Sequence, residues 1–255
     1  MRTTKTCLGI VCCLSLFGAT RASFSEERVH NNHGVEFETG WSALGYADVR
    51  IPGDTGSDIS LTEDLSAEAR PYVRGRMRVA LTDRQTLLIL VAPLTLHSTG
   101  TIDRPVDFEG ESFDAGVPLD STFTFNSYRA SWRYTFLQTP SLALSAGVTG
   151  KIRQAAIGLR GGGKAATKTN LGFVPLISFQ ATWWFAESMG LLLDGDALAA
   201  PQGRAEDVLV ALQVRVADPL VVYGGYRLLE GGADVDTAYT FSLIHYGALG
   251  VMAEF

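Results

Sequence analysis

The chain has 255 residues, a formal net charge of −6 at pH 7 and 46% hydrophobic residues. This length fits a single domain, and the acidic balance argues against a nucleic acid as partner. Composition alone decides no more than this, because a soluble enzyme could have the same totals.

The N-terminus has the pattern of a secretory signal peptide. Arg2 and Lys5 precede an apolar run over 7–18, and small residues follow up to Ala22. The apolar run is too short to span a bilayer. We therefore predict cleavage after Ala22, with 1–22 as the signal peptide and 23–34 as a polar N-terminal leader.

All three cysteines, Cys7, Cys12 and Cys13, fall within this predicted signal peptide. The mature chain would then have no disulfide and no thiolate metal site, and we expect no cofactor. After residue 22 no segment reaches 18 continuous apolar residues, so a transmembrane helix is not expected. The remaining locations are the periplasm, the exterior and the outer membrane as a β-barrel.

From residue 35 onward, strand-like segments alternate with turn signals, and no helical period appears. The predicted strands are 35–51, 67–81, 86–99, 122–137, 142–158, 169–185, 190–198, 205–217, 220–230 and 238–255. Tight turns alternate with longer connections, which are 52–66, 100–121, 159–168, 199–204 and 231–237. This alternation is typical of membrane barrels. We predict that 35–255 form an all-β, transmembrane up-and-down antiparallel barrel of about 10 strands, with 8 or 12 as alternatives.

Charged side chains repeatedly share one face of these strands. In 67–81, for example, apolar residues occupy one parity and arginines the other. We assign the charged face to the lumen, with a network of Glu36, Glu38, Arg74, Arg76, Arg78, Arg129, Arg133, Lys151, Arg153, Asp194, Asp196, Asp207, Arg215 and Arg227. Pairing around the 52–66 loop places Glu36 and Glu38 level with Arg78 and Arg76. Such pairs predict a plugged polar interior, with a narrow basic conduit as the alternative.

Aromatic residues gather beside the tight turns, as in the interface girdles of membrane barrels. The predicted inner girdle contains Trp132, Tyr134, Phe136, Trp183, Trp184, Tyr223 and Phe255. The predicted outer girdle, near the longer loops, contains Tyr46, Phe123, Tyr239 and Phe241.

The last segment, Ala238–Phe255, alternates in twos up to the terminal Phe255. It resembles the closing strand of Gram-negative outer-membrane β-barrels, which typically ends in an aromatic residue read by the insertion machinery. The resemblance implies integral residence in the outer membrane, with lipid and that machinery as partners. It also implies that this strand closes the barrel by pairing with 35–51. His245 falls on the parity that should face lipid.

Three aspartates form a second cluster. Counting through a short loop places Asp196 opposite Asp207, with Asp194 two residues below. Like charges so close require an arginine or a cation between them. We expect an Arg–Asp network, with a metal or proton-sharing site as the alternative.

Two kinds of barrel-embedded hydrolase offer an alternative explanation for these residues. Omptin-type outer-membrane proteases resemble ten-stranded barrels with paired aspartates and an Asp–His couple. Asp194, Asp196 and His245 are the residues here that resemble this set, and with Asp207 they are the weak catalytic candidates. Outer-membrane lipid A deacylases use His and Ser on one strand face, whereas alternation sends the adjacent His97 and Ser98 to opposite faces.

The sequence therefore favours an integral outer-membrane barrel with a charged, plugged lumen. Its exposed loops, 52–66 and 100–121, would serve binding of an extracellular ligand that the sequence does not identify, or limited porin-like passage of small solutes. The alternatives are a barrel-embedded hydrolase, either protease or lipid A-modifying, and a secreted soluble β-rich binding protein.

Overall fold

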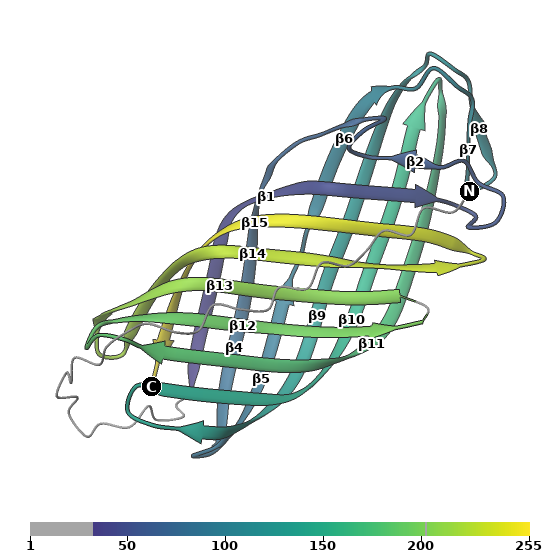
Figure 1. Cartoon of the computed structure of the whole chain (residues 1–255). Helices are drawn as coiled ribbons and strands as arrows, with labels where there is room; N and C mark the ends of the chain where they lie inside the picture. The colour runs from purple at the N-terminus through teal and green to yellow at the C-terminus, as the bar shows by residue number, and fades with distance from the viewer. Residues whose placement is uncertain (1–32, 202) are drawn as a thin grey trace, which may run out of the picture.

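The computed structural model describes residues 33–201 and 203–255, which form a closed antiparallel β-barrel (Figure 1). The predicted signal peptide and nearly all of the predicted leader lie outside the described residues. Within the described part of the chain, no helix is long and apolar enough to cross a membrane.

Ten wall strands build the barrel, which confirms the predicted fold and strand number. In the third wall position, β5 and β6 both pair with β9 and together make one interrupted strand. The wall strands are β1 (Gly34–Arg50), β4 (Arg70–Thr82), β5 (Gln85–Ala92) with β6 (Thr95–Thr101), β9 (Pro118–Gln138), β10 (Leu142–Gly161), β11 (Lys164–Trp184), β12 (Met189–Ala200), β13 (Gly203–Ala217), β14 (Leu220–Val235) and β15 (Ala238–Glu254). The interruption falls at Pro93, which has no N–H to donate to the ladder.

The barrel closes where the C-terminal strand meets the first. β15 pairs with β1 antiparallel from Gly34 opposite Glu254 to Arg50 opposite Tyr239. The predicted closing pair of strands is therefore confirmed. The register shifts once, between Leu44 and Tyr46, where β1 carries a bulge.

Three of the predicted long connections are in fact tight hairpins. The strands around 159–168, 199–204 and 231–237 continue pairing up to Gly161 opposite Lys164, Ala200 opposite Gly203 and Val235 opposite Ala238. The prediction failed there because the outer face of a strand beyond the membrane is in contact with water. Its outward residues can then be polar, so the two-residue alternation of hydropathy disappears. Gly162 and Gly163, with φ of 57° and 78°, supply the left-handed turn between β10 and β11.

The two remaining long loops, 51–69 and 102–117, fold over the outer end of the barrel (Figure 1). They contain the short strands β2 (Ile59–Ser60), β3 (Ser66–Ala67), β7 (Val106–Phe108) and β8 (Glu111–Phe113). We call these two loops the outer plug. Their buried side chains, among them Ile51, Leu61, Phe108 and Phe113, pack in one apolar cluster against inward residues of the wall. Phe123 is part of that cluster and only 6% exposed, so its predicted place in the outer girdle is wrong.

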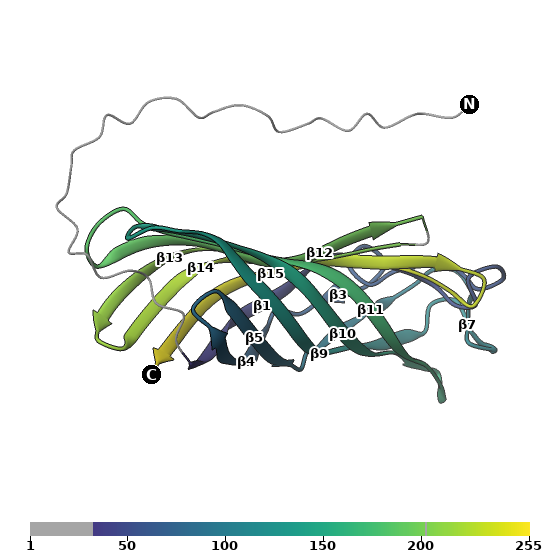
Figure 2. The ribbon, with the colours of Figure 1, turned by 90° about the horizontal axis from the view of Figure 1, so that it is seen from below.

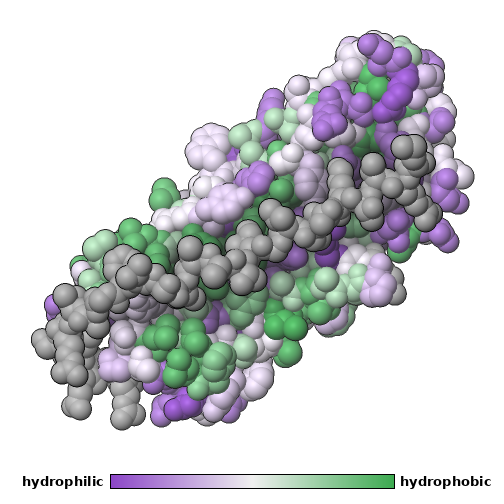
Figure 3. Space-filling model, viewed as in Figure 1, coloured by the Kyte–Doolittle hydropathy of each residue, from purple (hydrophilic) through white to green (hydrophobic). Residues whose placement is uncertain are grey.

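An apolar band surrounds the inner part of the wall. On β11 it runs from Leu171 and Phe173, which are 73% and 72% exposed, to Trp183. About twelve residue steps of about 3.3 Å, tilted by about 45°, rise about 28 Å, close to the band of a transmembrane barrel. In Figure 3 apolar side chains gather toward the short-turn end and polar ones around the outer end. A water-soluble barrel would expose this whole band to solvent.

The aromatic girdle is smaller than predicted. Exposed aromatic residues near the short turns are Trp132, Tyr134, Phe136, Trp183 and Phe255. Trp184 and Tyr223 are buried, at 7% and 3% exposed, and face the lumen. The assignment of both to the girdle is wrong, and for Trp184 strand alternation gives the reason, because neighbouring residues of a strand face opposite sides.

Candidate functional site

The lumen of the barrel is the candidate site, and it has three levels. A vestibule lies at the short-turn end, a layer of charged side chains lies in the middle, and a second cavity lies among the outer parts of the wall strands. Strand alternation creates this interior, because every second residue of each wall strand points inward.

The middle layer is a balanced network of buried charges, which we call the central charge network. It consists of five acids and five arginines: Glu36, Glu38, Asp194, Asp196, Asp207, Arg74, Arg76, Arg129, Arg133 and Arg227. All ten side chains are at most 10% exposed. Equal numbers of paired charges are what a buried interior requires.

Asp207 lies at the centre of this network. Its carboxylate accepts hydrogen bonds from Arg74 at 2.9 Å, from Arg129 at 2.5 Å and from Arg227 at 2.6 Å. These arginines stand on β4, β9 and β14, whereas Asp207 stands on β13. Because β4 and β9 lie across the barrel from β13, two of the three bonds cross the lumen.

Asp194 and Asp196 on β12 are held in the same way. Asp194 pairs with Arg133 at 2.7 Å and with Arg76 at 2.8 Å, and Asp196 pairs with Arg129 at 2.8 Å. Asp196 does lie opposite Asp207 in the β12–β13 ladder. Guanidinium groups separate the carboxylates, and no described group of three or more His, Cys, Asp or Glu is arranged to hold a metal ion.

Glu38 of β1 binds several side chains at the edge of the network. It accepts from Arg227 at 2.7 and 2.9 Å, from Tyr72 at 3.0 Å and from Tyr223 at 2.9 Å. In the ladder it lies opposite Arg74, and Glu36 lies opposite Arg76. The predicted levels, Glu36 with Arg78 and Glu38 with Arg76, are thus wrong by two residues. Counting failed there because the intervening loop folds into the outer plug instead of continuing the hairpin.

His245 does not join the aspartates. It faces outward on β15, and its Nδ1 shares a hydrogen bond with the hydroxyl of Tyr226 on β14. The bulge in β1 makes room for it, since a Cβ at Gly45 would lie 2.4 Å from His245 Nε2. The wall therefore separates the imidazole from Asp194, Asp196 and Asp207. His97 and Ser98 also point to opposite sides, with Ser98 buried against Ser121.

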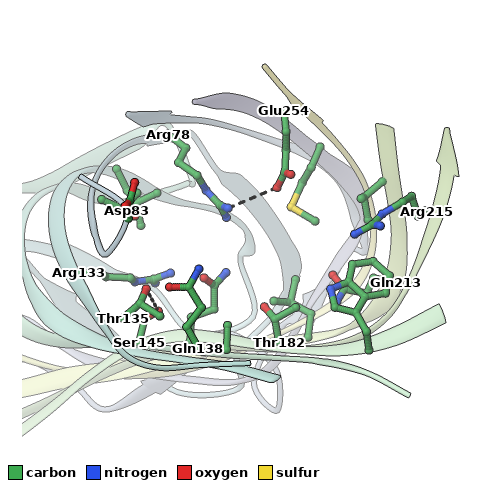
Figure 4. A pocket seen from close by; sticks show the side chains of 18 residues that line it. Arg78, Asp83, Arg133, Thr135, Gln138, Ser145, Thr182, Gln213, Arg215 and Glu254 are labelled. Carbon is green, nitrogen blue, oxygen red and sulfur yellow. Dashed lines mark hydrogen bonds and ion pairs between the residues drawn. The ribbon is translucent and has the colours of Figure 1, made fainter. Parts of the chain in front are cut away.

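The inner vestibule is a cavity of about 80 Å³ at the short-turn end (Figure 4). Arg78 of β4 pairs with Glu254 of β15 at 3.5 Å, over the start of β1 on one side of the vestibule. The guanidinium of Arg215 lies 4.8 Å from the ring centre of Trp184. These two predicted network members thus lie at the mouth of the barrel, outside the central charge network.

The second cavity, of about 130 Å³, lies among the outer parts of the wall strands and touches the outer plug at Ile51, and we call it the outer cavity. Its walls are mainly apolar, with Phe123, Phe125 and Ile157 among the lining residues. Lys151 and Arg153 of β10 line it as well. Lys151 is 4% exposed and its Nζ lies 4.8 Å from the ring centre of Phe125, while Arg153 donates to Asn170 at 2.6 Å. Both were predicted to belong to the lumen network, yet neither has a carboxylate within ion-pair distance among the described residues.

Sequence reasoning missed the hydroxyl groups that complete the central charge network. Ser127 accepts from Arg129 at 2.9 Å, Ser178 accepts from Arg133 at 2.8 Å, and Thr149 donates to Asp196 at 2.6 Å. A signal was present, because Ser127 and Thr149 each stand two residues before a lumen cation on the same strand.

Comparison with known proteins places the fold. No family model and no curated protein matches the chain. Among solved structures, the outer membrane protease OmpT from Escherichia coli superimposes with a TM-score of 0.58 at 10% identity, covering 92% of this chain and all of that one. The transport unit of the autotransporter AIDA-I from Escherichia coli (TM-score 0.42, 8% identity, 95% and 94% covered) and Ail of Yersinia pestis (0.39, 8%, 88% and 99%) are also similar. The chain therefore has the fold of the Gram-negative outer-membrane β-barrel proteins.

Proposed function

We propose that this protein is a sealed barrel of the outer membrane that works by binding at its outer end and does not pass solutes. The observation that carries this proposal is the pairing of Asp207 on one wall with Arg74 and Arg129 on the opposite wall. A path through the lumen would have to break these bonds. Breaking one buried pair leaves an uncompensated charge, at a cost of about 3–5 kcal/mol.

The outer plug supports the same proposal. Its apolar cluster lies between the central charge network and the outer solution, and an ion crossing it would lose its hydration shell without finding polar partners. The lumen is thus blocked twice, by different physical means.

The proposed orientation follows from the chain ends. The short turns would face the periplasm and the outer plug the exterior, with the apolar band in contact with outer-membrane lipid. Phe255, 74% exposed beside the closing seam, is the group that we propose the insertion machinery reads.

Release of potassium from vesicles tests the proposal. The purified barrel would be reconstituted into KCl-loaded phosphatidylcholine vesicles. The wild type is expected to retain the ion as empty vesicles do. A variant carrying Arg74→Ser, Arg129→Ser, Asp196→Ser and Asp207→Ser, with 102–117 replaced by a short glycine linker, removes two arginines and two aspartates of the central charge network together with one of the two loops of the outer plug. It is expected to leak. Rapid leakage through the wild type would contradict a sealed lumen and favour solute passage.

A further inference from the structure

The barrel wall has a gap beside the outer cavity. β11 and β12 pair only from Trp184 opposite Gly190 to Ile177 opposite Ala197. Above that point β11 continues as 164–176, paired with β10 on one edge and with no described strand on the other. The β10–β11 and β12–β13 hairpins lie well apart in both views of the ribbon (Figures 1 and 2). The two strands thus bound a slit that opens toward the outer end, and we call it the lateral slit.

The lateral slit begins within the apolar band, and its edges are apolar at that level. On β11 the outward residues at this level are Leu171 and Phe173, the two most exposed apolar side chains of that strand. On β12 the edge continues as Leu198, Ala199 and Ala200. An opening bordered by such residues at the membrane surface is accessible to hydrocarbon chains and disfavours polar solutes.

Two cations lie directly behind this opening. Lys151 is opposite Val174 in the β10–β11 ladder, and Arg153 is opposite Gly172, so both stand one strand away from the free edge. The other two cations that line the outer cavity are neutralised, Lys168 by Glu109 and Arg204 by Glu230. Asp48 of β1 also lines the cavity, but it is not within ion-pair distance of Lys151 or Arg153. Among the described residues, Lys151 lies over the Phe125 ring and forms no ion pair, and Arg153 Nε is buried without a hydrogen-bond partner.

A buried cation without a carboxylate within ion-pair distance is costly, and the nearest carboxylate of the central charge network, Asp207, already forms ion pairs with three arginines. An anion bound in the outer cavity would remove this cost. The apolar lining from Phe123, Phe125 and Ile157 would at the same time cover methylene groups. At about 130 Å³ the cavity has room for a head group and a few carbons, so the rest of a chain would lie in the lateral slit.

We propose that the outer cavity binds the carboxylate head of a single-chain, fatty-acid-like amphiphile, which enters from the outer leaflet through the lateral slit. Lys151 and Arg153 hold the carboxylate, and the slit edges hold the chain. This inference rests on the proposed function, since it names what the outer end binds.

Equilibrium binding of radiolabelled dodecanoate tests the site. The full barrel would be held in phosphatidylcholine nanodiscs at pH 8, where the carboxylic acid is ionised, with empty nanodiscs correcting for partition into lipid. Saturable binding is expected, and dodecanol, which lacks the charge, is expected to bind at least tenfold more weakly. Lys151→Met should weaken dodecanoate binding at least tenfold and leave dodecanol unchanged, whereas Lys151→Arg should stay within threefold of the wild type. Arg153→Gln is the second variant, and Arg160→Gln, on the same strand outside the cavity, is the matched control.

The outcomes separate the parts of the proposal. Absence of saturable dodecanoate binding, or equal binding by wild type and Lys151→Met, overturns the site, and if the vesicles still retain potassium, the sealed barrel stands without it. Equal affinity for dodecanol and dodecanoate shows a purely apolar cavity and overturns the role of the cations. Ala199→Glu, which places a like charge at the edge of the lateral slit, should slow dodecanoate association several-fold. An unchanged association rate would overturn entry through the slit.

Discussion

The central charge network and the outer cavity lie in one lumen, and both contain buried basic side chains. Those side chains form ion pairs in the network but not in the outer cavity. In the network every arginine has a carboxylate, and several of the bonds, such as those from Arg74 and Arg129 to Asp207, cross the lumen. In the outer cavity neither Lys151 nor Arg153 has a carboxylate within ion-pair distance among the described residues. The comparison teaches that the pairing of charges, more than their presence, distinguishes the level that we propose closes the barrel from the level at which we propose a ligand binds.

The largest expected effect is at Asp207. Asp207→Ala leaves Arg74, Arg129 and Arg227 buried without their shared carboxylate, and we expect the free energy of unfolding to fall by about 3–5 kcal/mol. Urea unfolding in lipid vesicles, followed by heat-modifiable electrophoretic mobility, measures it. Asp234→Ala, an exposed position of the β14–β15 hairpin, is the control and should change little. A loss below about 1 kcal/mol at Asp207 would show that the network does not hold the walls together.

A double-mutant cycle sharpens the pairing argument. Glu38→Gln and Arg227→Met should each destabilise the barrel by about 2–4 kcal/mol, because each leaves a buried partner charge. The double variant should cost less than the sum by about 1–3 kcal/mol, since it removes both charges together. Strict additivity in the same unfolding assay would contradict direct coupling of Glu38 and Arg227.

Lys151→Met is expected to change the free energy of unfolding in the opposite direction, and it therefore tests the contrast between the two levels. It removes a buried cation that no carboxylate compensates, and its apolar replacement fits an apolar cavity. We expect the ligand-free barrel to be unchanged or stabilised by about 1 kcal/mol. A loss comparable to that at Asp207 would place Lys151 within the network after all.

The smallest effect is expected at the rim. Arg204 pairs with Glu230, but its side chain is 44% exposed, and exposed pairs contribute about 0–1 kcal/mol. Arg204→Gln should therefore shift the free energy of unfolding by less than about 1 kcal/mol, and less still in high salt. A salt-insensitive loss of several kcal/mol would show that exposure does not separate this pair from the buried ones.

Local periodicity predicted most of the fold. Strand number, the charged inward face of strands such as β4 and the closing seam all follow from a two-residue period, which the strands carry in their own sequences. Asp196 falls opposite Asp207 because the connection between them is short, so that counting preserves the register. Counting across 51–69 missed the level of Glu36 by two residues, because that segment leaves the wall to build the outer plug.

The outer cavity and the lateral slit could not be predicted in this way. The slit exists because β11 is 21 residues long and β12 only 12, and the sequence near Ala200 shows no sign that its neighbour continues. The isolation of Lys151 depends on which carboxylates the opposite strands bring near it. That is a property of the closed barrel and is absent from any single strand.

The most direct test of the central claim is the conductance of the wild-type protein in a planar bilayer in 1 M KCl, with insertion verified by its heat-modifiable mobility. The cross-lumen bonds of Asp207 and the apolar outer plug predict no steady conductance steps at any moderate voltage. Discrete, long-lived steps from the wild-type protein would contradict the account, because ions would then cross the level at which Arg74 and Arg129 bind Asp207.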